Sequence, residues 1–367
     1  MKERKQQLSR LPLAIGATLL ILGLFSCKQI NRDTAQLHPS EKNKEPRIQL
    51  LRDDAQKQVS VLIDGQLFTA YRYPSNIKKP VLYPLVTPEG STITRKFPLE
   101  PSAGERADHP HHVGVWFNYG DVNGLDFWNN SDSIKVERRN EYGTIVHKNF
   151  LEIQGGDSTG LLKVAMDWIA PSGEVLLTEN TTFLFKGEGD VYSIDRITQL
   201  SAPNGPVLFK DNKEGVLGIR VARALEHPSD KPIVFTDANG LPTAVPVLNN
   251  DGVNGNYINS EGVEGNDCWG KRADWVNLTS SIGKENISLV ILDHKNNPGY
   301  PTYWHARGYG LFASNPLGQE VFSKGEETLN FRLEQGEAVT FKHSIIVASK
   351  HLGKTELDHR FSQFNNE

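Results

Sequence analysis

The chain has 367 residues, and its 44 Asp and Glu against 40 Lys and Arg give a formal net charge of −4. It is longer than a small disulfide-stapled module and carries no basic stripe outside its N-terminus, so we expect no nucleic-acid partner. The 32 Gly and 20 Pro residues are spread along the chain and favour many turns over long helices.

Residues 1–26 have the pattern of a secretory signal peptide. Basic residues precede a short apolar run over residues 11–25, and the run ends in Leu-Phe-Ser-Cys, which resembles the bacterial lipobox. We therefore expect Cys27 to be lipidated and to become the mature N-terminus; a signal-anchor helix with an incidental cysteine is the alternative. Lys28, rather than Asp, follows Cys27. This favours a lipoprotein of the outer membrane with its domain in the periplasm or on the cell surface.

The polar residues 27–46 lack apolar periodicity, which predicts a disordered tether between the lipid and the domain. Residues 47–367 are expected to form a single domain. Cys268 is the one cysteine left after Cys27, so an internal disulfide is excluded and a large buried core has to stabilise the domain.

Short apolar runs separated by turn residues dominate the domain. Residues 58–63 and 66–71 flank Asp64-Gly65, which predicts a two-residue β-hairpin turn. Similar runs cover residues 142–153, 161–169, 175–186, 191–200, 216–224, 288–292, 329–333 and 338–348. Turns at about every 8–12 residues are typical of sandwiches and barrels.

Two segments depart from the strand pattern. Residues 354–364 place Leu357, Phe361 and Phe364 at helical spacing, which predicts a short C-terminal helix. The Gly- and Asn-rich residues 242–265 predict a functional loop or a disordered insert. The fold class that we expect is all-β, a large antiparallel β-sandwich.

The densest polar and aromatic segment covers residues 108–128 and contains His109, His111 and His112. If this run is extended, His109 and His111 point to one face and His112 to the other. Such a pair is able to ligate one metal ion, to act as acid and base, or to donate hydrogen bonds to hydroxyl groups. The structural alternative is that the imidazoles cap loops through backbone hydrogen bonds.

Three further segments gather charged and aromatic side chains: residues 211–220, 268–275 and 292–307. Five of the six Trp residues fall in or beside these four segments. Aromatic faces next to Asp, Asn, His and Arg suit a sugar, because its C–H faces stack while its hydroxyl groups need polar partners. The alternative is that the tryptophans belong to the core.

The same segments carry a resemblance to the bacterial family labelled "methane oxygenase PmoA". The motifs are residues 83–95, Asp-His-Pro-His-His at 108–112, 121–128, Lys-Glu-Gly at 213–215, 218–222, Trp-Gly-Lys-Arg at 269–272 and 293–313. Val113 departs from the family pattern, in which Arg is expected. Particulate methane monooxygenase subunits lie among membrane helices, whereas this chain has no apolar segment of spanning length outside its signal. The resemblance therefore implies a β-supersandwich similar to galactose mutarotases.

Such folds bind a sugar and use His with a carboxylate for proton transfer, which implies a carbohydrate-active acid/base enzyme: an epimerase, lyase or hydrolase. The implied acid, base or metal-ligand residues are His109, His111 and His305, with Glu214 as the carboxylate. The implied sugar contacts are Arg95, His112, Trp128, Arg272, Trp304 and Arg307. Whether a divalent metal binds, at His109 and His111 if anywhere, stays open. A non-catalytic glycan-binding lipoprotein and a metal-dependent oxygenase, as the label says, are the alternatives.

Overall fold

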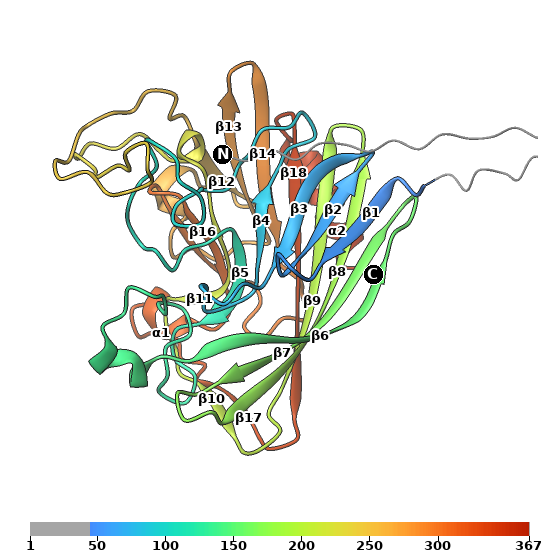
Figure 1. Ribbon diagram of the computed structural model, residues 1–367, viewed down its shortest axis with the longest axis vertical. Coiled ribbons are helices and arrows are strands. Elements are labelled where there is room, and N and C mark those ends of the chain that lie inside the picture. The colour runs from blue at the N-terminus through green and yellow to red at the C-terminus, as the bar shows by residue number, and fades with distance from the viewer. Residues whose placement is uncertain (1–44, 367) are drawn as a thin grey trace, which may run out of the picture. The chain divides into compact units, whose positions relative to one another are not determined.

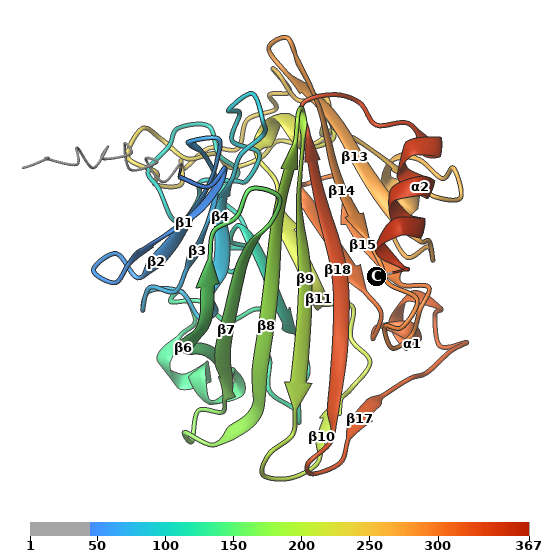
Figure 2. The same ribbon diagram turned by 90° about the vertical axis from the view of Figure 1, so that its right-hand side faces the viewer.

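The computed structural model describes residues 45–366, and these form one compact unit built from two large antiparallel sheets (Figures 1 and 2). The first sheet has eight strands, in the order β1 (Ile48–Asp53), β2 (Gln58–Ile63), β3 (Gln66–Arg72), β4 (Val81–Leu85), β5 (Val115–Tyr119), β11 (Gly215–Arg220), β16 (Leu311–Asn315) and β15 (Tyr303–Arg307). The second also has eight, in the order β12 (Asn256–Asn259), β13 (Trp275–Ile282), β14 (Glu285–Leu292), β18 (Ala338–Ala348), β9 (Val191–Ser201), β8 (Val175–Glu188), β7 (Gly160–Ile169) and β6 (Thr144–Gln154).

Short elements complete the unit. They are a two-stranded sheet of β10 (Val207–Phe209) and β17 (Phe331–Leu333), the helices α1 (Gln319–Phe322) and α2 (Lys354–Phe364), and the 3-10 turns η1 (Val136–Glu141), η2 (Arg223–Leu225) and η3 (Gly265–Cys268). Among the described residues, neither helix is long and apolar enough to span a bilayer. The signal peptide, Cys27 and most of the tether lie outside the described residues.

The main core lies between the two sheets, because each sheet turns alternate apolar side chains toward the other. Val115, Phe117 and Tyr119 of β5 enter this core from the first sheet, and Trp168 of β7 enters it from the second. The expected all-β fold, a large antiparallel sandwich with a short C-terminal helix, is confirmed.

Two local predictions are confirmed at the residue level. The β2–β3 hairpin turns at Asp64 and Gly65, whose φ angles are 51° and 79°, as a type I′ turn requires. Helix α2 covers Lys354–Phe364 and packs Leu357, Phe361 and Phe364 against the outer side of β14 and β18 (Figure 2).

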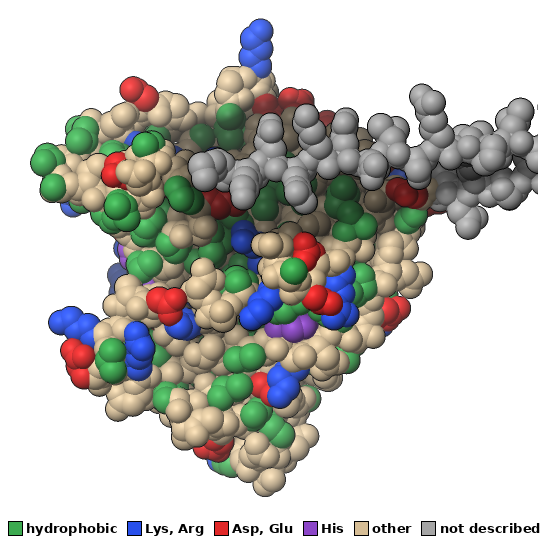
Figure 3. Space-filling model, in the orientation of Figure 1, with side chains coloured by type: hydrophobic (Ala, Val, Ile, Leu, Met, Phe, Trp, Pro, Cys, Tyr) green, Lys and Arg blue, Asp and Glu red, His purple; other side chains and the backbone are tan. Residues whose placement is uncertain are grey.

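Other boundaries differ from the prediction for identifiable reasons. The run predicted over residues 216–224 ends as a strand at Arg220, because Ala222 caps the 3-10 turn η2. The segment 242–265 is not a structureless loop, since it contains strand β12 and the start of η3. In the loop before β12, Leu241, Val245, Val247 and Leu248 leave 50–68% of their surface exposed, and hydrophobic side chains stand out on this loop in Figure 3.

The outer face of the first sheet positions the candidate site. Cross-strand pairing places Trp116, Gly218, Ala313 and His305 in one row across β5, β11, β16 and β15. The neighbouring row holds Arg220, Leu311 and Arg307. Side chains from β15, from the β15–β16 turn and from the loop before β5 therefore meet on this face.

Candidate functional site

His109 to His112 form a tight turn shortly before β5. The His112 N–H donates to the His109 carbonyl at 2.9 Å, and Pro110 takes the second turn position, where its fixed φ is favoured. His109 has a positive φ of 42°. The expectation of an extended run with His109 and His111 on one face is therefore wrong, because Pro110 starts a turn that lets the His109 and His112 rings face each other.

Arg95 ties this turn to the rest of the chain. Its guanidinium is 1% exposed and donates to the carbonyls of Arg106, Asp108, His109 and His112 at 2.7–3.0 Å, and to the Asp108 carboxylate at 2.8 Å. Its buried Nη groups are thus occupied by the protein. The expectation that Arg95 binds a substrate is wrong, since it positions the turn instead.

Asp108 lies between two buried guanidinium groups. Its Oδ1 accepts hydrogen bonds from Arg95 at 2.8 Å and from Arg220 at 2.5 Å, and its Oδ2 lies 3.3 Å from Nδ1 of His109. Burial by itself raises the pKa of Asp108, but His109 and the two guanidinium groups outweigh burial and hold the pKa well below its usual range. Asp108 is therefore a permanent carboxylate that orients the His109 ring.

Tyr309, His109, His112 and Trp116 stack in a column, which we call the ring stack. Successive ring centroids lie 5.1, 4.8 and 5.2 Å apart, with interplanar angles of 4°, 2° and 17°. The His109 side chain is 40% exposed, whereas His112 and Trp116 are buried. A ligand is therefore able to reach the stack at its Tyr309–His109 end.

The buried end of the stack is structural. Trp128 Nε1 lies 3.2 Å from Nε2 of His112, and Arg220 Nη1 lies 3.2 Å from its Nδ1. Both neighbours are N–H donors, so the two nitrogens cannot both be protonated, and burial lowers the pKa of His112 well below its usual value. The expectation that His112 and Trp128 contact a sugar is wrong, because they are only 1% and 0% exposed.

His305 stands beside Ala313 on the outer face of β15, with its tautomer fixed. Nδ1 lies 3.0 Å from the Lys213 carbonyl, which only accepts hydrogen bonds, so Nδ1 carries the proton and Nε2 carries the lone pair. The Glu214 carboxylate lies 3.7 Å from the same Nδ1. Burial, assisted by the charge of Lys213, lowers the pKa of His305 to about 3, which leaves the imidazole neutral at neutral pH.

The structure thus brings His305 and Glu214 together and places the exposed end of the ring stack nearby. The charges of His109 and Arg307 both contribute to the lowered pKa of His305, and that of Glu214 acts on Tyr309. Burial raises the pKa of Tyr309 to about 12, so its hydroxyl group keeps its proton. We call His109, His305, Glu214 and Tyr309 the proton-transfer cluster.

A cavity of about 300 Å³ adjoins this cluster and is lined in part by Trp269, Arg307 and Tyr309. The exposed Arg307 guanidinium lies over the Trp269 ring at 5.3 Å and over the Tyr309 ring at 5.9 Å. No ion pair of the described residues involves Arg307. Of the three arginines expected to contact substrate, Arg307 is the one whose charge is available.

The structure places Arg272 and Trp304 away from this cavity. Arg272 donates to the carbonyls of Gly299 and Pro301 at 2.9 and 2.6 Å and pairs with Glu327. Its guanidinium therefore stabilises the loop before β15. Trp304 is 0% exposed in the core between the sheets, because it alternates with His305 along β15. The expectation of a sugar contact is wrong for the fully buried Trp304, whereas for Arg272, whose side chain is 27% exposed, it stays a prediction.

His111 touches His109 but does not line the cavity beside Arg307 and Tyr309. Its ring meets those of His109 and His112 edge to face, and it lines a different cavity beside Lys79. Between residues 45 and 366 no group of three or more His, Cys, Asp or Glu side chains is arranged to hold a metal ion. The His109–His111 pair therefore lacks the further ligands that a closed site needs, and we derive no step through a metal.

Four contributors were not among the expected site residues: Asp108, Arg220, Trp269 and Tyr309. Tyr309 sits in the β15–β16 turn, where the Gly310 N–H donates to the Arg307 carbonyl at 2.9 Å. The Arg-Gly-Tyr-Gly sequence, with Gly on both sides of Tyr309, is a recognisable turn signal between two strands. This turn places Arg307 and Tyr309 together at the cavity.

Several solved structures are similar to the chain at low identity. The galactosidase domain of α-galactosidase-sucrose kinase AgaSK is 8% identical, with a TM-score of 0.41, over 82% of this chain and 42% of that one. The GH36 α-galactosidase AgaB from Geobacillus stearothermophilus is 9% identical, with a TM-score of 0.38, over 82% and 41%. A galactose mutarotase related enzyme from Lactobacillus acidophilus is 9% identical, with a TM-score of 0.31, over 83% and 98%.

The chain spans less than half the length of the two galactosidase structures. The comparison with curated proteins gives no match. A family model described as "Family of unknown function (DUF6807)" matches residues 58–362, and the chain therefore belongs to this family.

Proposed function

We propose that the protein is a carbohydrate-active enzyme that moves protons on a sugar derivative. The observation that carries this proposal is the environment of His305, whose Nδ1–H is held by the Lys213 carbonyl at 3.0 Å with the Glu214 carboxylate at 3.7 Å. A histidine with a fixed tautomer and a carboxylate beside its protonated nitrogen is the arrangement of a general base.

In this mechanism His305 accepts a proton at Nε2 and becomes an imidazolium ion. The Glu214 carboxylate stabilises that positive charge in a site with little solvent, where such an interaction is stronger than in water. Tyr309 keeps its proton at neutral pH and serves as the hydrogen-bond donor or acid toward the substrate oxygen. His109, oriented by Asp108, is the second group able to return a proton.

The carboxylates favour epimerisation or elimination over glycoside hydrolysis. Hydrolysis in most glycosidase families needs two carboxyl groups beside the scissile bond, one of them protonated. Asp108 is held in its charged form by Arg95 and Arg220, and Glu214 is ion-paired with the Lys213 ammonium group, so the described part of the chain offers no protonated carboxyl group beside His305. A saccharide substrate is supported by the Trp269, Arg307 and Tyr309 lining of the adjoining cavity.

The experiment measures proton exchange without requiring a known substrate. The protein is incubated in D2O with a panel of neutral aldoses, uronic acids and short oligosaccharides, and proton NMR follows deuterium incorporation, epimer formation and appearance of alkenes. Wild-type protein should turn over at least one compound, and His305→Asn should lower that rate by about a hundredfold or more. His359→Gln, at an exposed position of α2, is the matched control.

Two outcomes would contradict the proposal in different ways. If His305→Asn and Glu214→Gln both keep full turnover, the assignment of the base is wrong. If saccharides bind, as saturation-transfer NMR would detect, but no compound exchanges protons or changes, the protein is a non-catalytic glycan-binding protein instead.

We also propose that Cys27 anchors the protein to the bacterial envelope through a lipid. Replacing it by Cys27→Ala should move the protein from the membrane fraction to the soluble fraction of the cells. Cys268→Ala is the control, since this buried thiol is expected to have no part in anchoring. An unchanged distribution of the Cys27→Ala protein would favour the signal-anchor helix.

A further inference from the structure

Lys79 is a buried amine without a carboxylate partner. Its residue is 3% exposed, and Nζ donates to the carbonyls of His111 at 2.8 Å and Trp128 at 3.3 Å. No ion pair of the described residues includes Lys79. The carboxylate that acts on it, Asp126, accepts its own hydrogen bonds from the backbone and side chain of Asn129 at 2.9 and 2.7 Å.

The two carbonyls and the Trp116 ring, whose centroid lies 5.4 Å from Nζ, give a buried ammonium ion no negative counter-charge. An ammonium group has three N–H donors and a charge that is costly to bury, whereas a neutral amine has two donors and one lone pair. Burial accordingly lowers the pKa of Lys79 to about 7, against a smaller opposing effect of Asp126. At neutral pH a large share of the molecules therefore carries a nucleophilic amine at this position.

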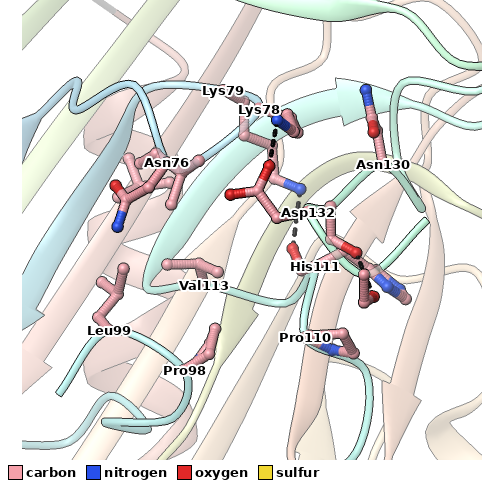
Figure 4. Close-up of a pocket in the computed structure, with 14 residues that line it drawn as sticks. Asn76, Lys78, Lys79, Pro98, Leu99, Pro110, His111, Val113, Asn130 and Asp132 are labelled. Carbon is pink, nitrogen blue, oxygen red and sulfur yellow. Dashed lines mark hydrogen bonds and ion pairs between the residues drawn. The ribbon is translucent and has the colours of Figure 1, made fainter. Parts of the chain in front are cut away.

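The amine borders a cavity of about 300 Å³ (Figure 4). Val81, Leu99 and Val113 contribute apolar walls, and Asn130 and Ser131 contribute polar groups. The cavity suits a small compound that has both C–H and hydroxyl groups.

His111 lines the same cavity, and its backbone carbonyl accepts the hydrogen bond from the amine. Its Nε2 is buried without a hydrogen-bond partner, and burial together with the charge of Lys79 lowers its pKa to about 2. His111 is therefore neutral, so it adds no charge that would oppose a neutral ligand.

We propose that Lys79 is a nucleophile that forms a Schiff base with a small hydroxyaldehyde or hydroxyketone in this cavity. The amine lone pair attacks the carbonyl carbon, the carbonyl oxygen takes up a proton, and the carbinolamine loses one water molecule to give the imine. The step needs no oxidant or reductant. This inference does not depend on His305 or Glu214, neither of which lines the Lys79 cavity, so each proposal fails or holds by itself.

The test traps the imine in the wild-type protein. The protein is treated at pH 7 with limiting glyceraldehyde and sodium cyanoborohydride, and peptide mass spectrometry locates the secondary amine that forms. Lys78 is the internal control, because it lines the same cavity but is ion-paired with Asp132 (Figure 4). Labelling of Lys79 should exceed that of Lys78 by about tenfold or more, since an ordinary lysine is almost fully protonated at pH 7.

The proposal is overturned if the label falls on exposed lysines while Lys79 stays unmodified. A pH series adds a second criterion, because the rate at Lys79 should reach half of its maximum near pH 7. Lys79→Arg keeps donors for the two carbonyls and should abolish the adduct, whereas Lys78→Arg should leave it unchanged. If Lys79→Arg does not fold, the mapping and the pH series of the wild-type protein still decide the question.

Discussion

The turn at His109–His112 is held by buried cations of two kinds. Arg95 and Arg220 share the Asp108 carboxylate, whereas Lys79 has no carboxylate partner among the described residues and contacts the carbonyls of His111 and Trp128 and the Trp116 ring. A cation that has a counter-ion remains charged when it is buried, and one without a counter-ion loses its proton more easily. The two arginines with Asp108 fix the geometry of the turn, whereas the Lys79 amine is the group that we propose to be reactive.

Removing the counter-ion should have the largest effect. Asp108→Asn leaves two buried guanidinium groups without a carboxylate, so we expect the free energy of unfolding to fall by about 3 kcal/mol at pH 7, as measured by urea denaturation. The control is Asp132→Asn, which breaks the pair with Lys78 at a carboxylate that is 59% exposed and should cost less than about 1 kcal/mol.

The free energy of unfolding at acid pH provides an independent check that Asp108 is the counter-ion. The pKa of Asp108 is depressed in the folded state, so its stabilisation is complete above the unfolded pKa of about 3.9 and is lost as the pH falls below that value. Asp108→Asn should lack this part of the acid dependence. Parallel acid profiles for the two proteins would mean that Asp108 is not the counter-ion.

Removing the Tyr309 hydroxyl group should leave stability almost unchanged and lower the activity instead. Tyr309→Phe keeps the ring that stacks on His109 at 5.1 Å but removes the proposed acid. We expect turnover of a substrate found in the D2O panel to fall by about a hundredfold, with the unfolding midpoint nearly unchanged. Full turnover in Tyr309→Phe would assign the acid role to His109 instead.

Removing the Lys79 amine should have the smallest effect on stability per pH unit. The unfolded chain keeps Lys79 protonated up to about pH 10.4, whereas the folded protein releases that proton near pH 7, so stability should rise with pH between these values. We expect a contribution of about 1 kcal/mol per pH unit that Lys79→Met lacks. Denaturation curves at several pH values would measure the difference, and equal slopes would show that Lys79 stays charged.

The sequence predicted the outer parts of the fold better than the strands beneath the site. The β2–β3 hairpin and α2 have strong local signals, an Asp-Gly turn and a helical apolar stripe. Strands β5 and β15 were not predicted, because they are almost wholly buried and lack the alternation of polar and apolar residues that marks a half-exposed strand.

Because β5 and β15 were not predicted, only some of the expected site residues could be placed correctly. Local density of His, Arg and Trp located the right segments but not the face to which each side chain points. Once β15 is known to be a strand, His305 and Trp304 must lie on opposite faces, and only His305 reaches the site. Arg95 and Arg272 could not be separated from Arg307 by sequence alone, because their partners are backbone carbonyls of distant loops.

The β15–β16 connection has a mutational consequence. Arg307 and Tyr309 sit on one four-residue turn at the end of two strands whose pairing does not depend on what the turn carries. A substitution at Arg307 or Tyr309 therefore changes the side chains at the cavity without touching the backbone hydrogen bonds that Gly308 and Gly310 accept from His227 and Val221.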